Sequence, residues 1–306
     1  MTSSPAGDTP AVARQRVRGA LRRARRRTDF TQTDVATRLG WSLSKVQRIE
    51  LGEVGVSETD LRALLELYGV TASDVVATLT EDARLARRER WVTHPEHRKH
   101  LTPGFRRLLQ FEEVATQIRS YQPLYLPGFL QTAAMAKYII DQAGRDLTAD
   151  ERRVRFDVRM SRRKAIIERT DGPTHYLVID ESVILRNFGG SDVMIEQLED
   201  LAEVATRRHV FLRLMPLWES TGAILGAMGN FMLVNLSDDD ADDSVMYRER
   251  VSTDYLDHEP DKIIPYRNAF ERLWEHSLPE AAARDRIGAR ASELRIEKYR
   301  TRAMNQ

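Results

Sequence analysis

A six-residue run, LSKVQR, brings together side chains that can read the edges of DNA bases. Lys45 and Arg48 can donate hydrogen bonds to guanine O6 and N7, and Gln47 can pair with adenine through both atoms of its amide. Ser44 can bond to either base, and Leu43 is apolar and suits the methyl group of thymine. The run therefore indicates a surface for direct readout of double-stranded DNA.

The segment around this run, residues 31–53, predicts two short helices joined by a tight turn. Two helices that cross steeply need a small residue where they meet, and Ala36 is there. The turn needs a residue that accepts a left-handed backbone, and Gly40 follows four positions later. Val46 comes six positions further on and anchors the second helix; Val35, Leu39 and Ile49 complete a small core. This order predicts a helix-turn-helix, with an ordinary helical hairpin as the alternative.

Polar residues at the start of the two helices predict caps and phosphate contacts. Thr31 and Ser42 can each accept a hydrogen bond from free backbone amides. Gln32 and Ser42, at helix N-termini, are placed to bind phosphate through side chain and backbone. Eight arginines occur in residues 1–30. Of these, Arg22 and Arg26 are the candidates for further, sequence-independent phosphate contacts.

Composition sets the class of protein and its compartment. The chain has 306 residues, 42% hydrophobic and 30% charged, which is typical of a soluble globular protein of about two domains. It has no cysteine, which excludes disulfides and thiolate zinc sites and favours the cytoplasm. No apolar run reaches the length of a membrane span, and no secretory signal is expected.

Charge is distributed unevenly, although the formal net charge is only +1. The arginine-rich first thirty residues contain two acidic residues, whereas residues 237–261 contain ten acidic residues against two arginines. This asymmetry predicts that the N-terminal part contacts phosphate and that the remainder does not.

The hydrophobic pattern changes once along the chain and predicts two domains. We expect a disordered tail (1–11), a helix-turn-helix domain (12–90), a linker (91–104) and a regulatory domain (105–300). The first domain shows five helical segments, the last four at 31–39, 43–50, 57–68 and 73–90. In the second, helical patterns occur at 105–120, 128–143, 150–168, 191–207, 260–276 and 279–300. Runs rich in β-branched and aromatic residues at 175–179, 210–215, 230–236 and 244–247 predict strands. The expected fold is mainly α, with an α+β second domain of helices and a small mixed sheet.

Several residues could do other chemistry, and the sequence gives each a structural alternative. Asp180 and Glu181 follow a predicted strand, with neighbours of catalytic type elsewhere: His175, Arg186, His209 and Glu249. The favoured interpretation is that Asp180 caps a short helix over residues 181–187. No phosphate-binding glycine loop and no nucleophile elbow occurs, so we do not expect an enzyme.

Two clusters could hold a metal ion. His94, His97 and His100 recur at intervals of three, but Pro95 disturbs that helix and no fourth ligand is evident. The acidic run 237–243 lacks the spacing of a calcium loop. We therefore expect no metal site and no cofactor.

The N-terminal motifs carry a family resemblance. Residues 12–80 resemble the lambda-repressor/Cro-type (XRE) DNA-binding domain, with Gln32 opening the second helix and Glu50-Leu51-Gly52 closing the third. The resemblance implies that the third helix lies in the major groove, with Leu43, Ser44, Lys45, Gln47 and Arg48 facing outward. Since operators of such domains are usually paired half-sites, a homodimer is expected.

The remainder of the chain resembles the C-terminal domain of actinobacterial Scr-type antitoxin-like regulators. The resemblance rests on YQPLYLPGFLQTAAMAKYI (121–139), IDESVILRNFGG (179–190) and further pieces up to about Leu278. It implies a small partner protein, encoded nearby, that modulates DNA binding. The chain departs from the family at Arg162-Arg163-Lys164, where members commonly have an arginine-glutamine pair.

The expected function is therefore a sequence-specific transcriptional regulator in the cytoplasm, associated with the nucleoid. Two alternatives stay open for the second domain: a sensor that binds a small-molecule ligand, and an enzyme fused to the DNA-binding domain.

Overall fold

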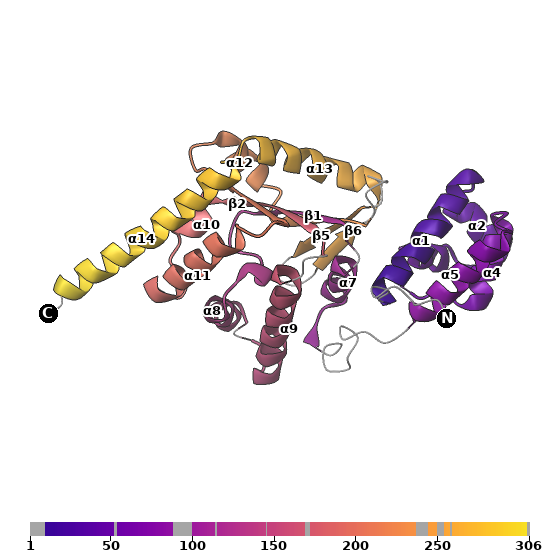
Figure 1. The fold of residues 1–306 in the computed structure, drawn as a ribbon, viewed down its shortest axis with the longest axis horizontal. Coiled ribbons are helices and arrows are strands. Elements are labelled where there is room, and N and C mark those ends of the chain that lie inside the picture. Colours follow the sequence, from indigo (N-terminus) through magenta and orange to yellow (C-terminus); the bar gives the residue numbers. More distant parts are fainter. Residues whose placement is uncertain are drawn as a thin grey trace. The chain divides into compact units, whose positions relative to one another are not determined.

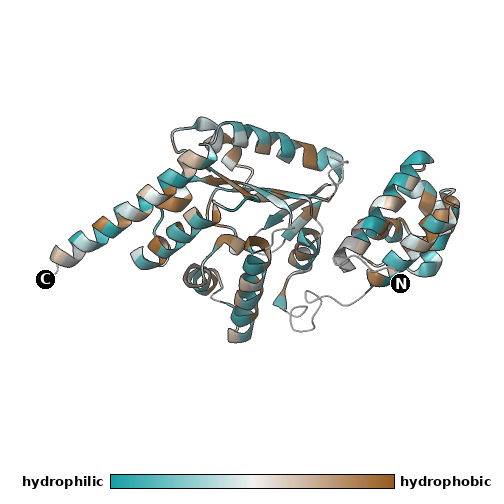
Figure 2. Ribbon diagram, viewed as in Figure 1, coloured by the Kyte–Doolittle hydropathy of each residue, from teal (hydrophilic) through white to brown (hydrophobic). Residues whose placement is uncertain are grey.

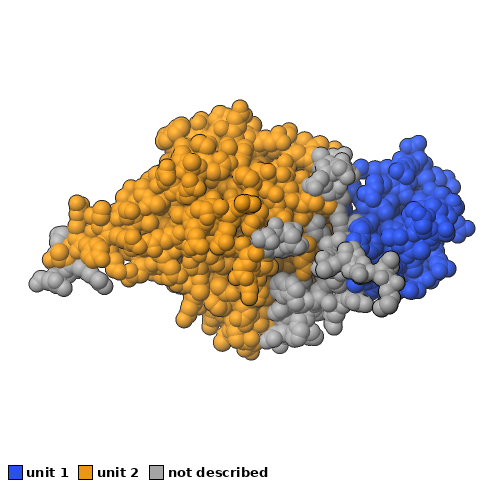
Figure 3. Space-filling view, in the orientation of Figure 1, with its two compact units in different colours: residues 1–94 blue, residues 95–306 orange. Residues whose placement is uncertain are grey.

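The computed structural model describes residues 10–51, 54–87, 100–113, 115–144, 146–168, 172–236, 244–249, 254–257 and 259–304. Contacts divide the chain into two compact units, residues 1–94 (unit 1) and residues 95–306 (unit 2), which are coloured separately in Figure 3. Most of the expected tail (1–9) and of the expected linker (91–99) lies outside the described residues.

The described part of unit 1 is a bundle of five helices (Figure 1). They are α1 (Pro10–Arg27), α2 (Gln32–Leu39), α3 (Leu43–Glu50), α4 (Glu58–Leu67) and α5 (Ser73–Leu85). Each helix buries one apolar stripe in a shared core, where Leu21 of α1, Val46 of α3 and Leu61 of α4 are fully or almost fully buried. The expected five-helix domain is confirmed.

Unit 2 is built on a mixed sheet, whose described strands follow the order β3-β2-β1-β4-β5-β6. The strands are β1 (Gln117–Gln122), β2 (Thr174–Asp180), β3 (Val210–Met215), β4 (Phe231–Asn235), β5 (Ser244–Glu249) and β6 (Asp254–Asp257). β1, β2 and β3 are parallel, whereas β4, β5 and β6 pair antiparallel. In the central register Tyr121 of β1 lies between Val178 of β2 and Phe231 of β4. The expected small mixed sheet is confirmed.

Helices cover both faces of this sheet. They are α7 (Pro103–Glu112), the 3-10 helix η2 (Gly128–Leu130), α8 (Ala133–Ala143), α9 (Ala149–Ile167), α10 (Glu181–Leu185), α11 (Ser191–Val204), α12 (Ser220–Gly226), α13 (Pro260–Glu275) and α14 (Glu280–Met304). Leu177 of β2 packs in one core with Leu198 of α11 and Ile287 of α14. The next residue, Val178, faces the opposite core with Phe270 of α13, as the alternation of a strand requires. Figure 2 shows hydrophilic and hydrophobic residues alternating along these helices, which is typical of amphipathic helices on a sheet.

One predicted element is wrong in its second half. The helix expected over 105–120 ends at Glu112, and Gln117–Gln122 form β1. This strand pairs with β2 on one edge and β4 on the other, and its Ile118 and Tyr121 are buried in the cores on opposite faces. Because neighbouring strands and both cores decide its conformation, the local helical pattern is overridden.

Two short elements were not expected from the sequence. They are α12 and the four-residue β6, which pairs with β5 at the edge of the sheet. Among the described helices, none combines the length and the apolar composition required to cross a lipid bilayer.

Candidate nucleic-acid interface

The turn between α2 and α3 has the geometry that its sequence predicts. Gly40 adopts a left-handed backbone with φ of 64°, and the Trp41 amide donates to the Ala36 carbonyl at 2.8 Å. Thr31 caps α2 in a reciprocal box with Asp34, and the Ser42 hydroxyl caps α3 by accepting from the Lys45 amide at 3.2 Å. Both predicted caps and the glycine turn are confirmed, so the start of α3 is fixed by local bonds.

The predicted readout residues lie on the outer side of α3. Leu43, Ser44 and Arg48 are exposed, as is the cap Ser42, whereas Gln47 and Lys45 are partly exposed. The two intervening apolar residues, Val46 and Ile49, are buried in the core of unit 1. The helix thus separates a packing side from an outer side that is exposed or partly exposed.

Lys45 already has partners within unit 1. Its ammonium lies 2.8 Å from the Asp60 carboxylate of α4 and 3.7 Å from the centre of the Trp41 ring. A guanine contact by Lys45 therefore requires the ammonium to leave Asp60. The sequence did not indicate this pair, because the two residues are on different helices.

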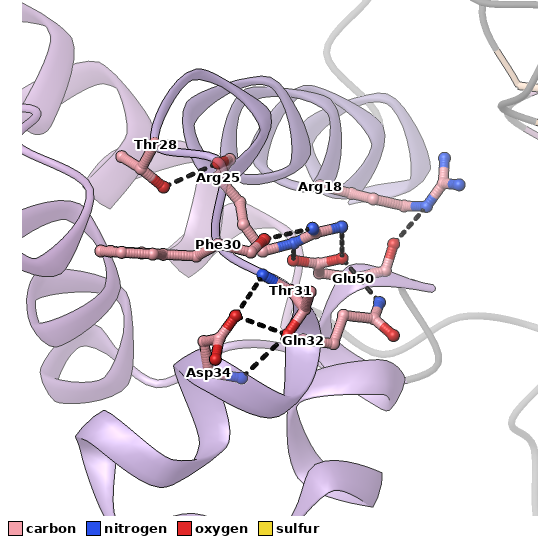
Figure 4. Close-up of polar contacts among 8 residues, drawn as sticks. All are labelled: Arg18, Arg25, Thr28, Phe30, Thr31, Gln32, Asp34 and Glu50. Carbon is pink, nitrogen blue, oxygen red and sulfur yellow. Dashed lines mark hydrogen bonds and ion pairs between the residues drawn. The ribbon is translucent and has the colours of Figure 1, made fainter.

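Gln32 lies in the first turn of α2, but its side chain faces Glu50, whereas the sequence predicted that it would face a phosphate. The amide nitrogen donates to Glu50 Oε2 at 2.8 Å, instead of being presented to a phosphate (Figure 4). Asp34 adds a carboxylate to the first turn of α2. Since a carboxylate there opposes an approaching phosphate, Ser42 is better placed than Gln32 for a phosphate contact.

Glu50 is the centre of a buried polar cluster that fixes α3 to α1 and α2. The residue is 3% exposed, and Arg25 donates to both carboxylate oxygens, at 2.6 and 3.0 Å. Arg18 donates to the Glu50 carbonyl at 2.7 Å, and Arg25 also reaches the Phe30 carbonyl at 2.8 Å (Figure 4). A bidentate Arg–carboxylate pair fixes both distance and orientation. The C-terminal end of α3 is therefore attached to both preceding helices.

The cluster changes the pKa of its members. Burial lowers the pKa of Arg25, but the hydrogen bond and charge of Glu50 outweigh it and raise that pKa above its usual value. The pKa of Tyr68 is raised by burial and then by the charge of Glu50. Both residues thus keep their protons across the ordinary range of pH.

Two arginines of α1 were predicted to bind phosphate. Arg26 is exposed and Arg22 is partly exposed, one turn apart on the same helix. Arg18 and Arg25 belong to the same arginine-rich run, but they are structural. Their spacing of seven puts both on the buried side with Leu21, and this signal was available in the sequence.

The residues of catalytic type in unit 2 are held by structural contacts. The predicted cap is confirmed, because Asp180 Oδ1 accepts from the Ser182 amide at 2.9 Å. Glu181 pairs with Arg286 at 2.7 Å. His175 lies near the other end of β2, five residues away, or roughly 17 Å along a strand. The strand therefore separates His175 from the two carboxylates.

The other candidates of the sequence also have definite places. His209 bonds through Nε2 to the Ile166 carbonyl at 2.9 Å. Arg186 ends α10 as its C-terminal cap residue. His94, His97 and the acidic run 237–243 lie outside the described residues. Within the described ranges, no group of three histidine, aspartate or glutamate side chains is arranged to hold a metal ion.

The sequence departs from the pattern of the resembled family at Arg162-Arg163-Lys164. Both arginines of this segment form ion pairs within unit 2. Arg162 is buried and donates through Nε to Glu112 Oε2 at 2.7 Å, and its guanidinium lies 5.0 Å from the Phe129 ring centre. Arg163 pairs with Asp200 of α11. Both arginines therefore join α9 to its neighbours.

Family profiles match both parts of the chain. A profile for a helix-turn-helix domain matches residues 17–79, which include the whole of α2, α3 and α4. A profile described as a domain of unknown function (DUF5753) matches residues 105–289, more than half of the chain. No curated protein and no solved structure matches the chain. The helix-turn-helix match shows the class of the first unit, that of a DNA-binding regulator.

Proposed function

This chain belongs to the family of the domain of unknown function DUF5753, here preceded by a helix-turn-helix domain, and we propose that it is a sequence-specific transcriptional regulator of the XRE type. It acts on chromosomal DNA in the cytoplasm, as a homodimer on paired half-sites. Neither unit has a catalytic role in this proposal.

One observation carries the proposal: one side of α3 packs in the core of unit 1, and the opposite side is polar and accessible. Val46 and Ile49 are buried, and Glu50 is tied to Arg25, so the helix has a fixed position. The opposite side presents Gln47 and Arg48, whose hydrogen-bonding groups suit adenine and guanine in the major groove. A rigid helix with a polar outer side fits the task of direct base readout.

The test is capture of genomic DNA by the full-length protein, followed by titration of a captured fragment. We expect Gln47→Ala and Arg48→Ala each to weaken binding by about 5- to 150-fold, since a good base contact contributes roughly 1–3 kcal/mol. Arg84→Ala is the matched control, because it removes an exposed arginine from α5 that pairs with Glu58. Circular dichroism checks that all variants fold. Equal affinity of the wild type and both α3 variants for the fragment would contradict readout by α3.

For unit 2 we propose an antitoxin-like role, in which a small partner protein encoded nearby docks and modulates DNA binding. The supporting feature is three large apolar side chains that are exposed after β3: Leu217, Trp218 and Ile224. Exposed apolar side chains of this size suit a site of protein association when they form one patch.

Co-expression with the product of a neighbouring short reading frame tests this role. We expect a complex with the wild type and none with Trp218→Ser/Ile224→Ser. The control is Ile264→Ser, which makes the same type of substitution at an exposed residue of α13 and should leave the complex intact. A complex that survives the double substitution would place the partner elsewhere.

A second candidate function, a small-molecule sensor, is favoured by a recess between α7, β4 and β5. The recess is a small cavity of about 30 Å³ that opens to solvent, and Phe105, Tyr125 and Tyr247 line it. The Tyr247 side chain lines the recess, and its hydroxyl is buried beside Asp254. Glu249 lines the same recess and is partly open to solvent. Loss of hydration among its neighbours raises the pKa of its carboxyl, although the positive charge of Arg159 acts to lower that pKa.

This second function predicts stabilisation of unit 2 by a metabolite that pairs with the Tyr247 hydroxyl. A thermal-shift screen of small polar aromatic metabolites would show it, and Tyr247→Phe would reduce the shift. If the shift is equal in the wild type and in Tyr247→Phe, the recess is not the binding site.

A further inference from the structure

The last helix of the chain, α14 (Glu280–Met304), carries apolar residues on two opposite faces. One face is buried in the main core of unit 2 and consists of Ala283, Ile287, Ala291 and Leu294. The other face, here called the exposed seam, consists of Ala289, Ser292, Ile296, Tyr299 and Ala303, all of them exposed. At 3.6 residues per turn, the centres of the two faces lie about 165° apart around the helix.

The exposed seam has the spacing of a coiled-coil interface. Its residues follow one another at intervals of three, four, three and four, as the a and d positions of a heptad do. Its two large side chains, Ile296 and Tyr299, are 53% and 69% exposed. Figure 1 shows the C-terminal part of α14 extending beyond the other helices of unit 2. A second helix therefore has access to the seam.

The direction of α14 is fixed by ion pairs on its flank. Arg295 pairs with Glu199, and Lys298 pairs with Asp192, both on α11. These contacts hold the helix while the seam faces away from α11. A helix that is already ordered loses little conformational entropy when a partner binds.

We propose that the exposed seam of α14 is a homodimer interface, in which the seams of two copies pack antiparallel about a two-fold axis. In this arrangement Ile296 packs against Tyr299 of the partner subunit, and Ser292 against Ala303 of the partner subunit. The interface is self-complementary, as two-fold symmetry requires. The proposal deepens the proposed function, since it rests on the need for two DNA-binding units at a paired operator.

Charge selects the antiparallel direction. Glu293 and Arg300 flank the same side of the seam, one heptad apart. Glu293 pairs with Arg286 and Arg290 of its own helix. An antiparallel pair of seams adds Arg300 of the partner subunit beside this carboxylate, and does so twice. A parallel pair would instead bring Arg295 beside Arg300 of the partner subunit, which is a repulsive contact.

The size of the seam predicts a weak dimer. Fifteen helical residues extend roughly 22 Å, so the buried area is at the low end of specific interfaces. Dissociation in the micromolar range is expected for the free protein, and a paired operator then brings the two copies together.

Sedimentation equilibrium of the full chain without DNA tests the interface. We expect Ile296→Glu/Tyr299→Glu to raise the dimer dissociation constant at least about 100-fold, since it places charge at the centre of the interface. Ile264→Glu, an exposed residue of α13, leaves the constant unchanged. A wild type that stays monomeric at about 100 μM, or a dimer that the double substitution leaves intact, would overturn the proposal. Because no DNA is present, this readout is separate from any failure of operator binding.

Cysteine cross-linking tests the direction. The chain has no cysteine, so introduced thiols report only on their own contacts. A mixture of Ile296→Cys and Tyr299→Cys proteins should form a mixed disulfide faster than either protein forms one with itself, because facing layers join these two positions. Faster cross-linking of each variant with itself would show a parallel arrangement and refute the antiparallel seam.

Discussion

His175 makes the stability of unit 2 depend on pH. The side chain lies in β2 and is 1% exposed, and both ring nitrogens lack a hydrogen-bond partner among the described residues. Its ring centre is 5.5 Å from that of Phe129 and 6.4 Å from that of His209. Burial first, and then the electrostatic interactions with His209 and Arg162, lower its pKa to about 3. His175 is therefore neutral in the folded protein at any pH near neutrality.

The sign of the effect follows from the two pKa values. In the unfolded chain the pKa of histidine is about 6.5, so between pH 6.5 and pH 3 the unfolded state binds one more proton than the folded state. The contribution of neutral His175 to the free energy of unfolding is therefore fully present above pH 6.5, and it decreases as the pH is lowered towards 3. At pH 5 the difference is 1.5 pH units, or about 2 kcal/mol at 1.36 kcal/mol per unit.

The assay is urea unfolding of the wild type and of His175→Phe at pH 7.5, 6 and 5. Phenylalanine keeps an aromatic ring against Phe129 and cannot bind a proton. We expect the variant to gain about 2 kcal/mol relative to the wild type between pH 7.5 and pH 5. His276→Gln is the control, because His276 is half-exposed beside Glu219. If the wild type and His175→Phe lose stability in parallel as the pH falls, His175 is protonated in the fold and the reasoning is refuted.

Three further predictions concern unit 1. Glu50→Gln leaves the partly buried Arg25 without its anionic partner and should lower the free energy of unfolding of unit 1 by about 3 kcal/mol, measured by urea denaturation; an unchanged midpoint would contradict the importance of this pair. Gly40→Ala should cost about 1 kcal/mol in the same assay, because the left-handed backbone disfavours a β-carbon, and equal stability would show that the turn relaxes. Arg22→Ala and Arg26→Ala should each reduce the slope of log affinity against log salt concentration by about one for all DNA sequences; an unchanged slope would remove these residues from the phosphate contacts.

Local features of unit 1 could be predicted from the sequence because their causes are local. The caps at Thr31 and Ser42 and the left-handed turn at Gly40 each depend on residues within a few positions. The alternation of buried and outward residues along α3 follows from helical spacing alone. These features are confirmed, and they position the N-terminal end of α3.

Features that depend on distant partners could not be predicted in the same way. β1 forms because β2 and β4 flank it, and these strands begin 57 and 114 residues after its start at Gln117. The pairs Lys45–Asp60 and Gln32–Glu50 join residues on different helices. A side chain predicted to face DNA or phosphate from its position on a helix can still have a partner in the same domain.

These pairs explain how α3 can keep a fixed position while residues on its exposed side are substituted. Its last residue, Glu50, is held by Arg25 and Gln32, so substitutions there change the position of the whole helix. Its first residues, Leu43 and Ser44, are exposed, and in the described part of the chain no such side-chain bond to them is seen. Substitutions at these two positions should therefore change the preferred bases while leaving stability within about 0.5 kcal/mol of the wild type. The buried cluster sets where the helix lies, and in the proposed readout the exposed residues set which bases it selects.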